Sequence, residues 1–294
     1  MEPSNKGAYL AIISAFFIGM STIIASQVTK NVNPVLFASI YSLLSVPFLI
    51  AIYLLQKNNF NLIKLKSAFK EIMGVVITRN FFGSMLLMTG FSLTSGVRAV
   101  FLLGLDPVFV TILGAMFLKQ KITRKQIFLI AVLLAGVFLL STNLDFDSLG
   151  KNLQIGDLFV MAGVFCMSLA YFPSIGAMKK ISAMELTIVS NLIGGLILLP
   201  VALLFFNAHF NIAMDIWGLV FAYTILFAVF ALYAFYSALN FAKPWIVSSL
   251  LQLAPIPGVI FAFIWLGDVL SPVQIAGGLI IVICAYIISR IKHD

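Results

Sequence analysis

Charged residues are scarce in this sequence. They make up 10% of its 294 residues, whereas an average soluble domain contains about 25%. Hydrophobic residues make up 62%, and the mean hydropathy is +1.12. So few charges cannot cover a surface that faces water, which excludes an ordinary soluble domain. We therefore expect a protein whose surface lies mostly in a lipid bilayer.

Histidine and cysteine are almost absent as well. The two histidines are His209, in a connecting segment, and His293, near the C-terminus; the two cysteines, Cys166 and Cys284, fall in different apolar runs. Neither an HExxH nor a GxSxG motif occurs, so the usual frameworks of a metalloprotease or a serine hydrolase are missing. A glycine-rich phosphate loop is also missing, which argues against direct use of ATP. We expect no cofactor, no metal site and no enzymatic activity.

Long apolar runs are what the sequence does contain. A membrane-spanning helix needs about 20 mostly apolar residues, and ten runs come close to or exceed that length, with five in each half of the chain. The connections between the runs are short. The runs cover residues 7–29, 34–55, 71–93, 97–118, 126–143, 156–178, 184–206, 215–239, 245–266 and 272–291. This pattern predicts an all-α integral membrane protein with ten transmembrane helices.

One stretch of the sequence occurs twice. Residues 98–121 and 246–268 each carry a proline, Pro107 or Pro255, in an apolar segment that ends in Phe/Trp-Leu-X-Gln/Asp. The two prolines are 148 positions apart (255 minus 107), about half of the chain. We therefore expect two five-helix repeats, residues 1–147 and 148–294. Because five is an odd number, equivalent helices cross the membrane in opposite directions, and the repeats are inverted.

The basic residues predict the orientation in the membrane. Most of the 18 Lys and Arg residues fall in connections on the same side as the N-terminus, whereas the aspartates gather on the other side. The positive-inside rule then places both termini in the cytoplasm, with the protein in the cell (plasma or inner) membrane. This topology accounts for the formal net charge of +8, and no nucleic-acid partner is expected.

Inverted repeats favour transport, because such proteins bind their substrates near the bilayer midplane where the repeats meet. Two charged residues are predicted at that depth: Arg79, which is followed by Asn80, and Asp106. A charge in the membrane centre costs at least ~2.5 kcal/mol on insertion scales and marks a functional candidate. Two structural alternatives are that Arg79 snorkels to the headgroups and that the two charges form a static ion pair.

The second half supplies further candidates. Asn191 places an amide in the seventh run, and the eighth run has a polar and aromatic face with Tyr233, Tyr236 or Ser237, and Asn240 at helical spacing. Packing is the structural alternative for its tyrosines. The candidates for substrate binding are Arg79, Asn80, Asp106, Asn191, Tyr223, Tyr233, Tyr236 and Gln252, and those for gating or for the mouths of the path are Arg98, Pro107, Lys243 and Pro255.

The fifth and tenth runs, residues 126–143 and 272–291, contain few polar side chains. Such helices face lipid or a partner subunit rather than a polar path. If the protein forms a homodimer, we expect these two helices to make the interface.

The repeated features resemble the EamA-type branch of the drug/metabolite transporter superfamily. Each half contains Leu-X-X-X-Pro in its fourth run, at Leu103 to Pro107 and Leu251 to Pro255. The family usually has Leu-Gly-Glu at the end of that helix, whereas this chain has Leu118-Lys119-Gln120 and Leu266-Gly267-Asp268, which weakens any role for a glutamate there. The resemblance implies a basket whose helices one to four and six to nine surround the path, and secondary transport of small metabolites, often amino-acid export.

The functional hypothesis is alternating access around a midplane site. Arg79 would hold an anionic group, and Asp106 would hold an amine or carry a coupling proton. This pair of charges suits a small-molecule substrate that is an amino acid or a similar amphoteric metabolite, exported across the lipid bilayer. An organic-cation or drug exporter would need Asp106 but not Arg79, and a transporter of anionic metabolites would show the reverse. From another class, a non-transporting membrane scaffold or a membrane enzyme is the alternative.

Overall fold

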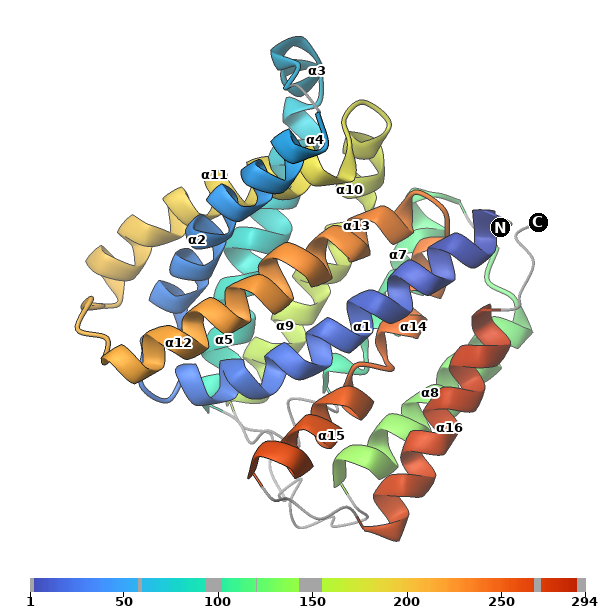
Figure 1. The fold of residues 1–294 in the computed structure, drawn as a ribbon. Coiled ribbons are helices and arrows are strands. Elements are labelled where there is room, and N and C mark those ends of the chain that lie inside the picture. The colour runs from blue at the N-terminus through green and yellow to red at the C-terminus, as the bar shows by residue number, and fades with distance from the viewer. Residues whose placement is uncertain are drawn as a thin grey trace.

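The protein is described by a computed structural model that covers residues 3–57, 60–93, 102–119, 121–142, 155–266 and 271–289. Within these ranges the chain forms helices and no strands (Figure 1). The first half contains α1 (Pro3–Val28), α2 (Pro34–Leu55), α3 (Leu62–Ser67), α4 (Phe69–Val75), η1 (Val76–Gly83), α5 (Ser84–Leu93), α7 (Asp106–Phe117) and α8 (Arg124–Thr142).

The second half follows the same order of long helices and short turns. It contains α9 (Ile155–Leu169), α10 (Tyr171–Met178), α11 (Ala183–Phe205), α12 (Met214–Tyr223), η2 (Thr224–Ala231), α13 (Leu232–Leu239), α14 (Pro244–Leu251), α15 (Pro255–Leu266) and α16 (Pro272–Ser289). These bounds agree closely with the predicted apolar runs. The helix predicted over 97–118 is described only from residue 102 onward.

Six helical segments of the described chain are long and apolar enough to cross a membrane. They are Asn5–Ala25, Pro34–Leu55, Phe69–Leu93, Ile155–Met178, Ala183–Phe205 and Met214–Leu239. The all-α membrane fold is thus confirmed, and the count of ten spans stays a prediction.

Local signals explain where several helices begin. Asn33 precedes α2, accepts hydrogen bonds from the backbone N–H groups of Val35 and Leu36, and is followed by a proline in the first turn. Ser182 and Glu185 form a capping box at the start of α11, in which each side chain accepts a hydrogen bond from the other residue's backbone N–H. Such caps satisfy N–H groups that have no partner inside the helix.

The helices pair as a two-repeat architecture requires. α2 packs against α11 and α8 against α16, and each of these pairs joins equivalent helices of the two halves. α7 packs against α14, so the parts of the equivalent fourth and ninth predicted helices that lie after Pro107 and before Pro255 also meet. α1 packs along α12, η2 and α13, while α9 and α10 pack along the segment from α4 to α5. Figure 1 shows α8 and α16 side by side at one edge of the bundle. This arrangement is consistent with the family basket expected from the resemblance.

Close packing depends on small residues, as the spacing of Ala11, Ala15 and Gly19 predicts. The two alanines are fully buried in α1. A Cβ atom at Gly19 would lie 2.0 Å from the carbonyl oxygen of Ala254. Gly19 therefore lets α1 approach the turn before α15.

Four irregularities occur in equivalent pairs. The π-helical segments η1 and η2 cover residues 76–83 and 224–231, and both their starts and their ends differ by 148 positions. The helical path also breaks just before Pro107 and just before Pro255, at turns that include Gly104 and Leu253. Broken helices of this kind line the sites of many transporters, and π-helical turns are frequent at functional sites.

Candidate functional site

Arg79 lies in η1 with only 8% of its surface exposed, so it does not snorkel to the headgroups. Its guanidinium carbon is 4.7 Å from the centre of the Phe235 ring and 5.7 Å from that of Tyr236. Cation–π contacts of desolvated groups contribute about 2 kcal/mol. Among the residues that the structure describes, no carboxylate lies within ion-pair distance of Arg79. The guanidinium is therefore held by aromatic faces, and its N–H groups are not committed to an acceptor.

Asp106 occupies the first turn of α7, where the helix dipole stabilises a negative charge. One carboxylate oxygen accepts a hydrogen bond from Ser168 Oγ at 2.6 Å, and the other accepts one from Tyr171 OH at 2.8 Å. Both donors belong to the second half of the chain. The static ion pair with Arg79, one of the two structural alternatives, is not seen among the described residues, where each group has other partners.

An aromatic pair connects the two charges. The Tyr171 ring contacts Phe235 edge to face, with 4.9 Å between the ring centres. Phe235 in turn makes the cation–π contact with the Arg79 guanidinium. Tyr171 can take this position because Pro173 has no N–H to bond the carbonyl of Leu169, and the sixth span breaks there into α9 and α10. Arg79 and Asp106 are also close enough to interact electrostatically.

Asn80 and Asn191 form a buried amide pair. Asn80 Nδ2 donates to Asn191 Oδ1 at 3.2 Å, and Asn191 Nδ2 donates to Ser45 Oγ at 2.9 Å. These bonds tie α2, η1 and α11 together. Asn80 Oδ1 is buried and has no hydrogen-bond partner in the described chain, and the buried hydroxyl of Tyr236 forms no hydrogen bond of ordinary length, although Ser174 and Ser190 lie near it. An unpaired buried polar atom costs about 1–3 kcal/mol, so both atoms are candidates for binding a ligand.

Gln252 lies in the turn before Pro255, at a contact between the halves. Its Nε2 atom donates to the carbonyl of Leu103 at 3.4 Å. Pro107 has no N–H to bond this carbonyl, which is four residues earlier. Gln252 of the second half thus satisfies a backbone group that the proline of the first half leaves free.

The remaining candidates are dispersed. Tyr223 packs among Phe37, Tyr41 and Phe227 in an aromatic cluster. Pro107 and Pro255 begin α7 and α15, and Lys243 directly precedes α14. Arg98 lies outside the described residues.

The predicted polar face of the eighth span divides in two. Tyr236 is buried beside Arg79, whereas Tyr233, Ser237 and Asn240 line a separate cavity of about 700 Å³. We call it the lysine cavity, after Lys6, Lys64, Lys179 and Lys180 in its wall. Of the predicted substrate-binding residues, only Tyr233 belongs to it.

Sequence reasoning missed the partners of the charged groups. Ser168 and Tyr171 are polar residues three positions apart in one predicted helix, and this spacing was the available signal for their shared role. Phe235 gave no signal, because one phenylalanine among 28 does not reveal that it lies under a guanidinium. The described chain contains no group of three His, Cys, Asp or Glu side chains that would hold a metal ion.

A solved crystal structure shares this fold. It superposes with a TM-score of 0.75 over 95% of this chain and 95% of its own, at 15% sequence identity. At that identity, the likeness concerns the fold alone.

Two sequence relatives are uncharacterized transporters. One, from Methanothermobacter thermautotrophicus, is 24% identical over 294 residues, which is 95% of this chain and 85% of the relative. The other, the uncharacterized transporter YyaM of Bacillus subtilis, is 29% identical over 139 residues, 46% of this chain and 45% of the relative.

The model of the EamA-like transporter family matches this chain twice, at residues 5–142 and 154–290. These two matches cover nearly all of the described helices. Together with the transporter names of the two relatives, they identify a membrane transporter and not an enzyme: the chain belongs to the EamA-like transporter family.

Proposed function

We propose that the protein is a secondary transporter that exports a small metabolite with a carboxylate group, an amino acid or a similar amphoteric compound. The observation that carries this proposal is the buried guanidinium of Arg79, which has no anion partner among the described residues. A guanidinium presents a planar set of N–H donors that matches a carboxylate. A substrate carboxylate would complete the site at the junction of the halves.

The other site residues receive roles from their contacts. Asn80 Oδ1, which lacks a partner in the described chain, and the nearby Tyr236 hydroxyl would bind donor groups of the substrate. Asp106 would accept a coupling proton or a substrate amine only after releasing Ser168 or Tyr171. Asn191, Tyr223, Tyr233 and Gln252 would shape the path and hold the halves in register.

The cycle would be alternating access. Residues 1–147 and 148–294 would act as inverted repeats that rock about the turns before Pro107 and Pro255, with Arg98 and Lys243 near the mouths of the path. Both termini would lie in the cytoplasm, and the protein would reside in the cell membrane.

Organic-cation export is the second candidate, because Asp106 is an intramembrane carboxylate. The contacts favour it less, since both oxygens of Asp106 already accept hydrogen bonds within the protein. Transport of a purely anionic metabolite would use Arg79 and leave Asp106 as a structural or proton-carrying group.

Flux through proteoliposomes tests the proposal. Amino acids, organic anions and organic cations would be compared for the unmodified protein, Arg79→Gln, Arg79→Lys and Asp106→Asn, with Lys125→Gln as an exposed control of equal charge change. We expect amino-acid flux, weakened roughly 10- to 100-fold in apparent affinity by Arg79→Gln. Arg79→Lys would rescue it only partly, because a lysine cannot bind a carboxylate bidentately. Flux of cations alone, insensitive to Arg79→Gln, would overturn the assignment.

A further inference from the structure

The lysine cavity lies apart from the Arg79 site. Its wall comes from the first turns of α1, the C-terminal end of α2, α3, the α10–α11 turn and the C-terminal end of α13. Figure 1 shows α3 and the α10–α11 turn at the same end of the bundle. Its volume, about 700 Å³, lies within the usual range for small-molecule sites.

One of the four cavity lysines already has an anionic partner. Lys180 Nζ is 2.6 Å from Glu71 Oε1 and donates to the backbone carbonyl of Ser67 at 2.8 Å. Lys180 therefore fixes the α10–α11 turn to the start of α4. Its charge is offset by Glu71.

The other three lysines are not neutralised in this way. Lys6, Lys64 and Lys179 form no ion pair with a carboxylate of the described chain. Lys6 Nζ lies 4.5 Å from the centre of the Phe241 ring, a contact that holds the ammonium without removing its charge. Three positive charges from three separate segments thus face one cavity.

The single acid in the cavity wall, Glu185, is committed to the protein. It is 6% exposed, and its Oε2 accepts a hydrogen bond from the backbone N–H of Ser182 at 2.8 Å. Tyr53 also lies beside it in the cavity wall. Its carboxylate serves the start of α11, so the cavity keeps an excess of positive charge.

We infer that the lysine cavity is a binding site for a phosphate group. Lysine ammonium groups bind phosphate as point charges, and basic pockets between helices at the membrane face bind phospholipid headgroups. Ser237 and Asn240, which also line the cavity, would add neutral hydrogen bonds to phosphate oxygens. The phosphate comes either from an anionic phospholipid or from a soluble phosphate compound. This site is independent of the proposed transport substrate.

Binding to the detergent-purified, lipid-depleted protein tests the inference. In the lipid arm, native mass spectrometry would measure binding of phosphatidylglycerol, with phosphatidylcholine as the zwitterionic comparison. In the soluble arm, calorimetry would measure inorganic phosphate against chloride at equal ionic strength. The variant Lys64→Gln/Lys179→Gln would be compared with Lys121→Gln/Lys125→Gln, whose lysines are exposed and lie outside the cavity wall.

Removal of the two cavity lysines should weaken phosphatidylglycerol or phosphate binding about 30-fold, while the control pair changes it little. Binding confined to the lipid arm would identify a phospholipid headgroup as the ligand, and binding in the soluble arm would identify a phosphate compound. Equal losses in the two double variants, or no binding of either probe, would overturn the inference. Thermal unfolding of each variant would show that it is folded.

Discussion

Asp106 joins the two halves of the molecule through two hydrogen bonds, one to Ser168 Oγ and one to Tyr171 OH. A carboxylate that accepts two hydroxyl donors in a low-dielectric interior is strongly stabilised. Movement of the α9–α10 segment relative to α7 must break at least one of these bonds. Protonation of Asp106 would weaken both hydrogen bonds. Asp106 would therefore control the contact between the repeats even if it never touches a substrate.

Removal of one of the two hydroxyl groups that donate to Asp106 should destabilise the protein. Tyr171→Phe leaves the ring contact with Phe235 but deletes the hydrogen bond to Asp106, at a cost of about 1 kcal/mol within a membrane protein. Tyr9→Phe is the matched control, because Tyr9 is 54% exposed. Reversible unfolding in mixed detergent micelles measures the difference. If the two variants unfold alike, Tyr171 does not contribute the bond seen here.

Sequence reasoning singled out the charged residues but could not supply their partners. The depth of Arg79 and Asp106 follows from counting residues along a helix. Their partners, Phe235 and Tyr171, belong to helices of the other half, and spacing along one helix does not determine which faces meet. For the same reason, the sequence left a static ion pair open as an alternative, whereas the structure has two separate sets of contacts.

At the scale of the element, the helix breaks near prolines could be predicted from the sequence, whereas the π-helical turns could not. Pro107 and Pro255 lack an N–H, so a break near each follows from covalent structure. A π-helical turn arises when one extra residue is accommodated by the packing of neighbouring helices. The carbonyl of Ala231 in η2 accepts a hydrogen bond from Ser14 of α1 at 2.9 Å, a contact between helices far apart in the sequence.

The α8–α16 pair depends on one of two adjacent glycines. A Cβ atom at Gly277 would lie 2.5 Å from the backbone nitrogen of Leu140, whereas the nearest atom to a Cβ at Gly278 is 4.0 Å away. Gly277→Ala should therefore force the helices apart, while Gly278→Ala should be tolerated. We expect a clearly lower midpoint of thermal unfolding for the first variant only. Equal midpoints would show that the pair does not pack as closely as described.

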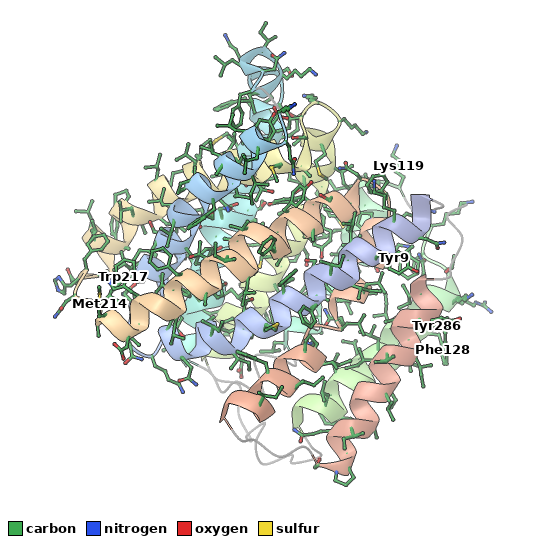
Figure 2. All side chains as sticks on the ribbon, viewed as in Figure 1. Tyr9, Lys119, Phe128, Met214, Trp217 and Tyr286 are labelled. Atoms are coloured by element: carbon green, nitrogen blue, oxygen red, sulfur yellow. The ribbon has the colours of Figure 1, made fainter. Side chains whose placement is uncertain are left out.

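The outer faces of this helix pair are apolar. Phe128 of α8 and Tyr286 of α16 are 66% and 61% exposed, and Figure 2 shows both at the edge of the molecule. Such faces fit the predicted contact with lipid or with a second subunit. A homodimer through these helices stays a prediction.

For the whole molecule, the repeat in the sequence predicted more of the helix arrangement than any single motif did. An offset of 148 residues predicted equivalent helices, and the structure pairs α2 with α11, α7 with α14 and α8 with α16. The pairing of α1 with the α12–α13 segment could not be predicted from the sequence, because it depends on how the surfaces of helices from different halves fit in space. The lysine cavity could not be predicted for the same reason, since its wall combines residues of α1, of the α2–α3 region, of the α10–α11 turn and of the end of α13.

The orientation in the membrane can be tested by labelling single cysteines in a variant without Cys166 and Cys284. Lys64 and Lys179 line the cavity at one end of the bundle. Lys30 and His209 are exposed residues of the α1–α2 and α11–α12 connections, which Figure 1 shows at the other end. A bond from Asn33 to the Phe206 carbonyl, at 3.5 Å, joins those two turns. By the positive-inside rule, a membrane-impermeant maleimide should label Lys30→Cys and His209→Cys on intact cells. Lys64→Cys and Lys179→Cys should react only after permeabilisation, and the reverse pattern would place both ends of α1 opposite to our assignment.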